Sequence, residues 1–135
     1  MLALVAAAMM AAAPAPDAVV GTWKSQTKNA VVEIKSCGGQ SLCGRLMSSD
    51  DISKDPQRKD AKNSDAKLRD RPLKGIQMLG GFRWDGSAWA DGWVYNGADG
   101  RTYKGKITIL DDNRIELRGC VFVPLCKTET WTRVS

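Results

Sequence analysis

Residues 101–119 read RTYKGKITILDDNRIELRG and contain the clearest structural pattern in the chain. In residues 101–110 apolar or small side chains alternate with polar ones, Tyr103, Gly105, Ile107 and Ile109 against Thr102, Lys104, Lys106 and Thr108. Residues 114–119 repeat the alternation, with Ile115, Leu117 and Gly119 against Arg114, Glu116 and Arg118. A period of two is typical of a strand with one buried face. Because Asp111, Asp112 and Asn113 form a turn between the two halves, the pattern predicts a β-hairpin.

The same rhythm extends outward from this hairpin. From Val20 onward, clusters of Gly, Asn and Asp separate segments rich in Val, Ile, Thr, Trp and Tyr, a spacing typical of an all-β sandwich or barrel. We place eight strands at residues 20–26, 30–36, 41–48, 76–83, 88–95, 101–110, 113–122 and 127–134. Short turns between successive strands give an antiparallel meander, and closure removes its exposed edges. The predicted fold is therefore all-β, an eight-stranded antiparallel up-and-down barrel.

An outer-membrane barrel is the competing architecture for eight strands. It requires apolar side chains that face lipid along strands of about 9–11 residues. The outward faces predicted here carry Lys, Arg, Glu and Thr instead, which favours a barrel that faces water.

One long charged segment, residues 48–74, interrupts the strand rhythm. It mixes basic and acidic residues and holds few large apolar side chains, so we expect it to contribute little to the core. A loop of this length in a small domain is usually functional or mobile. We expect it at one mouth of the barrel, with a short helix near residues 65–69.

The four cysteines form two pairs with the same spacing, Cys37 with Cys43 and Cys120 with Cys126. Zinc is the rival interpretation of four cysteines, but zinc ligands usually follow a C-x₂₋₄-C spacing, often with His, and this chain has no His. Paired cysteines in an exported domain favour disulfides. Three connectivities exist in principle. Local pairing, Cys37–Cys43 and Cys120–Cys126, is favoured because each pair brackets a turn-like segment.

The N-terminal residues 1–16, MLALVAAAMMAAAPAP, are uncharged and rich in alanine. They resemble a secretory signal peptide or its remnant, with A-x-A cleavage sites before Pro16; the alternative is a frayed or buried apolar helix. The run ends at Pro14 and Pro16 and is shorter than the roughly 20 apolar residues of a membrane span. We therefore expect no integral membrane span, a single barrel domain over residues 17–135, and a periplasmic or secreted protein.

The composition gives little support for nucleic-acid binding or catalysis. The net charge of +5 comes from 20 basic and 15 acidic residues; aspartates interleave with the basic residues, and the basic segment has no aromatic side chains for stacking. The chain lacks His, a G-x-S-x-G motif and a P-loop. We expect no nucleic-acid partner, no catalytic residue, no metal and no cofactor. An enzyme that uses carboxylates and tyrosines is the weakest hypothesis.

Two sets of motifs resemble known families. Gly21-Thr22-Trp23 in the first strand and Trp131-Thr132-Arg133 in the last resemble the lipocalin and calycin pattern, in which an arginine lies across the G-x-W tryptophan; this implies a structural pair, Trp23 with Arg133. Seven motifs over nearly the whole mature chain resemble the DUF2147 family: Gly21-Thr22-Trp23, Asp60-Ala61-Lys62-Asn63, Arg71-Pro72-Leu73-Lys74-Gly75, Gly92-Trp93-Val94-Tyr95-Asn96, Asp99-Gly100-Arg101-Thr102-Tyr103, Arg118-Gly119 and Trp131-Thr132-Arg133. That resemblance implies a lipocalin-like barrel in the bacterial envelope and no particular reaction.

The candidate ligand-binding residues lie in the predicted barrel interior and at its mouth. They are Trp23, Trp93, Tyr95, Asn96, Tyr103, Ile107, Leu117, Asp60, Asn63 and Arg71. Each also has a purely structural interpretation, because aromatic side chains can fill a core and tyrosines can pack across strands. An eight-stranded barrel is just wide enough either to be filled by its own side chains or to hold one small ligand.

Two functions follow from these two possibilities. In the first, the protein binds a small apolar or amphiphilic ligand inside the barrel without catalysis. In the second, the barrel is solid, and the protein is a structural or interaction module that docks an envelope protein through residues 48–74. The sequence leaves the ligand and the oligomeric state open.

Overall fold

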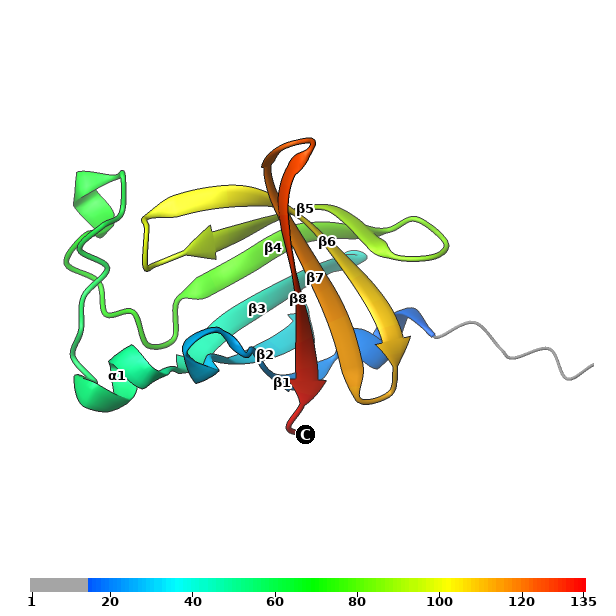
Figure 1. Cartoon of the computed structure of the whole chain (residues 1–135), viewed down its shortest axis with the longest axis horizontal. Helices are drawn as coiled ribbons and strands as arrows, with labels where there is room; N and C mark the ends of the chain where they lie inside the picture. The colour runs from blue at the N-terminus through cyan, green and yellow to red at the C-terminus, as the bar shows by residue number, and fades with distance from the viewer. Residues whose placement is uncertain (1–14) are drawn as a thin grey trace, which may run out of the picture.

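A computed structural model describes residues 15–135 and contains eight antiparallel strands that form one closed barrel in chain order (Figure 1). The strands are β1 (Gly21–Lys24), β2 (Val31–Ser36), β3 (Ser41–Ser48), β4 (Gln77–Trp84), β5 (Trp89–Asn96), β6 (Arg101–Asp111), β7 (Arg114–Phe122) and β8 (Leu125–Arg133). The predicted up-and-down barrel is thus confirmed, with strand ends within a few residues of those expected. Most of the predicted signal peptide, residues 1–14, lies outside the described residues.

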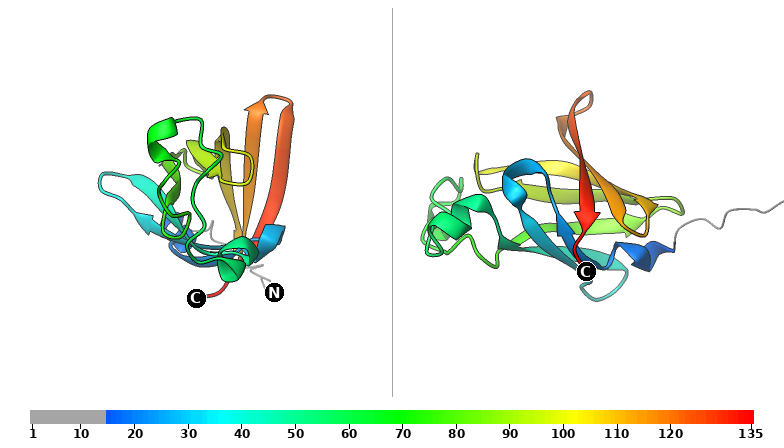
Figure 2. Two further views of the ribbon diagram at one scale, coloured as in Figure 1. Left: turned by 90° about the vertical axis from the view of Figure 1, so that its left-hand side faces the viewer. Right: turned by 60° about the horizontal axis from the view of Figure 1, so that its bottom comes forward.

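The strands alternate in direction, so the connections fall at two opposite ends of the barrel. The β2–β3, β4–β5 and β6–β7 turns lie at one end, which we call the closed end. The β1–β2, β3–β4, β5–β6 and β7–β8 connections lie at the other, which we call the mouth. Views from other directions show the long β3–β4 connection and the β7–β8 hairpin as separate projections (Figure 2).

The closed end is plugged by Trp23 on β1, which is fully buried. Its Nε1 donates to the carbonyl of Val19 at 2.9 Å, in the 3₁₀ turn η1 (Pro16–Val19). The Arg133 guanidinium lies over the Trp23 ring, 4.3 Å from its centroid, and donates to the carbonyls of Ala18 and Val20 at 2.5 and 3.1 Å. This one side chain therefore joins η1, β1 and β8.

Large side chains also fill the interior next to this plug. The Phe82 ring lies against the β5 and β6 backbones, because a Cβ built on Gly92 would be 2.3 Å from it and one on Gly105 2.8 Å. Ile107 is fully buried in the same cluster. These side chains occupy the interior of this half of the barrel.

The helical elements are short. Besides η1 they are η2 (Thr27–Asn29), α1 (Asp50–Lys54) and η3 (Ala66–Leu68). The helix expected near residues 65–69 corresponds to η3. Helix α1 was not predicted, although Ser49 caps it by accepting a hydrogen bond from the Ile52 amide at 3.2 Å. Among the described residues, no helix combines the length and apolar character that crossing a membrane requires.

The expectation that residues 48–74 contribute little to the core is wrong. Ile52 and Leu73 from this segment are 4% and 7% exposed, and they form a second apolar cluster with Ile76 and Tyr95 at the rim. Two apolar side chains from the segment are enough to extend the core, because they pack against the apolar barrel residues Ile76 and Tyr95. The segment is therefore packed onto the mouth.

Both disulfides are local. Cys37 is bonded to Cys43 in the β2–β3 hairpin at the closed end, and Cys120 to Cys126 in the β7–β8 hairpin at the mouth. Each bond clamps one hairpin.

Replacement of Arg133 tests the plug. We expect Arg133→Met to lower the free energy of unfolding by about 2–4 kcal/mol, because it removes both the contact with the Trp23 ring and the charged hydrogen bonds to the Ala18 and Val20 carbonyls. Arg133→Lys keeps the positive charge but lacks the planar guanidinium with its several donors, so it should lower the free energy of unfolding by an intermediate amount. Urea unfolding followed by tryptophan fluorescence measures both. Arg83→Met, at an exposed arginine, is the control and should change stability by less than about 0.5 kcal/mol; equal effects at the two sites would contradict this role of Arg133.

Candidate functional site

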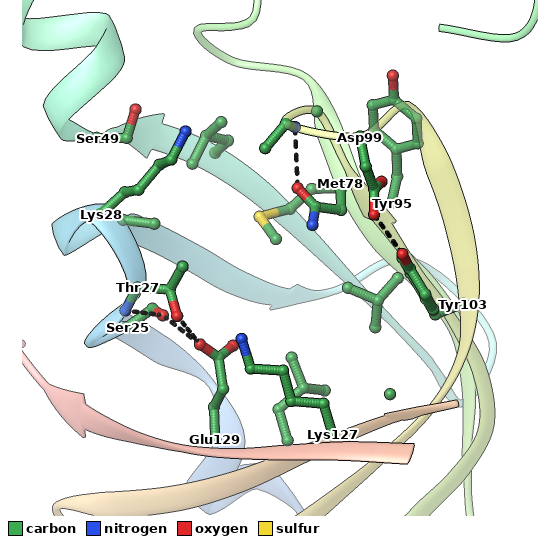
Figure 3. A pocket seen from close by; sticks show the side chains of 18 of the residues that line it. Ser25, Thr27, Lys28, Ser49, Met78, Tyr95, Asp99, Tyr103, Lys127 and Glu129 are labelled. Carbon is green, nitrogen blue, oxygen red and sulfur yellow. Dashed lines mark hydrogen bonds between the residues drawn. The ribbon is translucent and has the colours of Figure 1, made fainter. Parts of the chain in front are cut away.

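A cavity of about 640 Å³ opens at the mouth of the barrel. This volume lies within the range of about 300–1,000 Å³ that is usual for small-molecule sites. Its walls come from β3, β4, β5, β6, β7 and β8 and from the connections at the mouth (Figure 3). The barrel is thus filled at one end and hollow at the other.

Apolar side chains form the inner part of the cavity. They are Leu46, Met78, Val94, Leu117 and Trp131. Leu117 and Val94 point inward because side chains alternate along a strand. Gly119, two residues beyond Leu117, has no side chain, and a Cβ built there would meet its nearest neighbour, Tyr103 Cβ, at 3.7 Å. The missing side chain at this position keeps the cavity open.

Trp131 lines the cavity and carries a buried hydrogen-bond donor without a partner in the described part of the chain. The residue is 2% exposed, and its Nε1 is the one buried side-chain nitrogen or oxygen within residues 15–135 that lacks a partner. A buried tryptophan N–H usually finds an acceptor, and a buried donor without one costs about 1–3 kcal/mol. An acceptor atom supplied by a bound molecule would satisfy it.

Glu129 lies two residues from Trp131 on the same inner face of β8. Its Oε1 accepts hydrogen bonds from the hydroxyls of Ser25, at 3.4 Å, and Thr27 (Figure 3). These bonds span the gap between β8 and the β1–β2 connection, where backbone pairing has ended. Lys127, one further step toward the mouth, also lines the cavity.

The opposite wall carries a second set of polar groups, on the β5–β6 turn. The Tyr103 hydroxyl donates to a carboxylate oxygen of Asp99, and this hydrogen bond raises the pKa of Tyr103. Asn96 accepts from the Ala98 amide at 2.9 Å. The rim is therefore polar above an apolar interior.

An ion pair lies at the rim between η2 and α1. Lys28 Nζ is 2.7 Å from Asp51 Oδ2, and the hydrogen bond from Lys28 lowers the pKa of Asp51. The pair ties the β1–β2 connection to the β3–β4 segment on the cavity's edge.

A buried polar cluster behind the rim fastens residues 48–74 to the barrel. Asp60 is fully buried and accepts from Arg71 Nε at 2.9 Å, Asn63 Nδ2 at 2.9 Å and the Tyr95 hydroxyl at 2.5 Å. Burial, together with the hydrogen bond to Asp60, raises the pKa of Tyr95 to about 12. Tyr95 belongs to both regions, because it also lines the cavity.

The structure divides the predicted ligand-binding residues into three groups. Tyr95, Asn96, Tyr103 and Leu117 line the cavity. Trp23 and Ile107 lie in the filled half, and Trp93 is half-buried against Gly80. Asn63 and Arg71 each donate a hydrogen bond to Asp60 behind the rim.

Several cavity residues were not predicted, among them Met78, Lys127, Glu129 and Trp131. The alternation of β8 could have identified the last three, because a buried Trp131 implies that Glu129 and Lys127 share its face. Within residues 15–135, no three or more Cys, Asp or Glu side chains gather in a way that suits a metal ion.

Comparisons with known proteins agree with this architecture. The family model of DUF2147, described as an uncharacterized protein conserved in bacteria, matches residues 21–133. Among solved structures, the Helicobacter pylori protein HP1028, described as belonging to the lipocalin family, is similar at 27% sequence identity and a TM-score of 0.77. The match covers 92% of this chain and 85% of that one. No curated protein matches the chain.

The Tyr95–Asp60 bond gives a testable pH dependence. The folded-state pKa of Tyr95 is about 12 against about 10 in an unfolded chain, so its contribution to stability is complete below pH 10 and is lost as the pH rises toward 12. We expect Tyr95→Phe to lower the free energy of unfolding by about 1–3 kcal/mol at neutral pH, because Asp60 loses a donor, and to flatten the alkaline loss. Urea unfolding at neutral pH and between the two pKa values measures both. Tyr103→Phe removes the more exposed tyrosine, whose hydrogen bond to Asp99 is itself exposed, and should retain most of the alkaline loss; an unchanged alkaline loss in Tyr95→Phe would refute the assignment.

Proposed function

The chain belongs to the DUF2147 family, and we propose that it binds a small apolar or amphiphilic molecule in the mouth half of its barrel. The observation that carries this proposal is the cavity of about 640 Å³ with an apolar interior and a polar rim. Small-molecule sites typically combine an apolar lining with a few oriented polar groups. Lipocalin barrels of eight strands can hold one small ligand, and the similarity to HP1028, described as a lipocalin-family protein, supports the same use here.

The alternative function, a solid barrel that docks an envelope protein through residues 48–74, has less support. The interior is hollow at the mouth, and the apolar side chains of that segment, Ile52 and Leu73, are already buried against the rim. Its charged side chains partly pair with one another or with the barrel, as Arg71 does with Asp60 and Lys28 with Asp51.

The polar groups of the cavity favour a neutral acceptor on the ligand. Trp131 lines the cavity, and its buried Nε1 has no acceptor among the described residues. An anionic group beside Trp131 would lie nearer along β8 to the Glu129 carboxylate, two residues away, than to the Lys127 ammonium, four residues away, and like charges in a partly buried site repel. A carbonyl, ether or hydroxyl oxygen on an otherwise apolar molecule meets both conditions.

We also propose that the protein works in an oxidising compartment outside the cytoplasm. Two disulfides support this, because they persist in the periplasm and in secreted proteins and are rare where thiols are kept reduced.

Filling the cavity from Gly119 tests the proposed function. Nile red, a neutral apolar fluorophore, should bind the purified protein and brighten. We expect Gly119→Leu to weaken its binding at least tenfold, because the new side chain occupies the cavity; an effect of this size corresponds to about 1.4 kcal/mol. Gly119→Ala is the matched control, since its Cβ makes only an ordinary contact at 3.7 Å. Unchanged Nile red affinity in a folded Gly119→Leu protein would sink the proposal.

The Trp131 donor is tested with two competitors of equal chain length, a methyl ketone and an alkane, that displace Nile red. We expect Trp131→Phe to weaken the ketone about fivefold, the equivalent of one neutral hydrogen bond of about 1 kcal/mol, and to leave the alkane unchanged. Trp89→Phe is the control, because Trp89 Nε1 already donates to the Pro16 carbonyl at 3.0 Å and Trp89 lies outside the cavity lining. Equal losses for ketone and alkane would show that the ring, and not the N–H, contributes the affinity.

A further inference from the structure

The β7–β8 hairpin ends in an apolar tip, residues 121–125, that is exposed to solvent. Val121, Phe122, Val123 and Leu125 are 54%, 60%, 75% and 58% exposed. The hairpin projects beyond the other strands at the top of Figure 1. Isolated exposed apolar residues are ordinary, but a contiguous group usually marks an interaction site.

The tip is held in this exposed position by its own covalent structure. The Cys120–Cys126 disulfide joins the two strands directly below it, and Pro124 lies within the turn. The disulfide keeps the two strands together at the base of the tip, and the apolar side chains above it stay in water unless a partner covers them.

Three cations lie on one face of β6 and β7, below the tip. Lys104 lies opposite Cys120 in the β6–β7 register, and Lys106 lies directly opposite Arg118. All three cations are exposed, and none of them forms a salt bridge with a residue of the described chain. Like charges directly opposite one another destabilise a strand pair. The nearest carboxylate along β7, Glu116, lies on the side away from the tip.

We propose that this tip inserts into the surface of an anionic phospholipid bilayer. On insertion, the apolar side chains of the tip would reach the acyl chains of the bilayer, and the cations at its base would lie level with the negatively charged headgroups. A stable protein interface takes about 20–30 residues from each side, far more than the five residues of the tip. Insertion into a bilayer does not require an interface of that size.

Docking of this kind also brings the cavity to the membrane. Val121, Pro124 and Leu125 line the cavity as well as forming the tip, so insertion places the mouth next to the acyl chains. An apolar ligand could then pass between bilayer and cavity without crossing water. This transfer step rests on the proposed function, whereas the docking does not.

Sedimentation of the full chain with lipid vesicles tests the docking. We expect the protein to pellet with vesicles of phosphatidylglycerol and phosphatidylethanolamine, less strongly as salt is added, and not with vesicles of phosphatidylcholine alone. Phe122→Ser/Val123→Ser should weaken binding at least tenfold. Lys104→Glu/Arg118→Glu should weaken it by about fivefold or more per charge. Lys24→Glu/Arg83→Glu, with the same change of net charge away from the tip, should bind as the wild type does.

The proposal is overturned if the wild type stays in the supernatant with the anionic vesicles, or if the serine variant pellets as well as the wild type. It is also overturned if the tip mediates self-association that the serine variant abolishes while vesicles bind neither protein. Urea unfolding followed by tryptophan fluorescence confirms that the serine variant folds. Phe122 and Val123 do not line the cavity, so Nile red binding should also be unchanged. The same measurement separates failure of docking from failure of the proposed function.

Discussion

The seam between β1 and β8 sets the shape of the whole barrel. β1 spans only Gly21–Lys24, and its backbone pairs with β8 in register at two positions, Trp23 with Arg133 and Lys24 with Thr132. Arg133 compensates for this short pairing, because one guanidinium covers the Trp23 ring and reaches carbonyls of the N-terminal turn. After Lys24 the chain leaves the sheet, and side-chain bonds to Glu129 replace backbone pairing. The cavity lies on that side of the seam.

Filled and hollow halves of one barrel have different requirements. In the closed half, the Phe82 ring packs against Gly92 and Gly105, and Ile107 is buried in the same cluster, which gives the dense interior on which stability depends. In the mouth half, the walls must stand apart without a core between them. Packing from outside supports them there: Ile52 and Leu73 cover the rim, and the buried Asp60 is satisfied by three donors. Polar groups can be buried at such a place because their hydrogen bonds are complete.

The sequence was sufficient for the strands but only partly for the site. Alternation with a period of two is a local property, so the β6–β7 hairpin and the order of eight strands were predictable from residues 101–119 outward. The positions of the tryptophans could not be predicted from local pattern. Trp23 plugs the closed end, Trp131 lines the cavity and Trp93 is half-buried against Gly80. Their roles depend on where the barrel closes. The bond from Tyr95 to Asp60 joins residues 35 positions apart, and no periodicity relates them. Ile52 and Leu73 were missed for the same reason, since isolated apolar residues in a charged segment have no pattern.

The placement of the disulfides has a mechanical consequence. Each joins residues only six positions apart. Neither disulfide links β1 to β8, so the closure of the barrel between these two strands is not covalent. The backbone near Thr22 bonds to Val134 and Ser135, which places the two ends of the barrel chain side by side. Tension applied to both ends would therefore load the seam hydrogen bonds one after another, as in a zipper, rather than together in shear. The barrel would open first between Trp23 and Arg133. The segments 37–43 and 120–126, which the disulfides close, could not be extended even after the rest of the chain had unfolded.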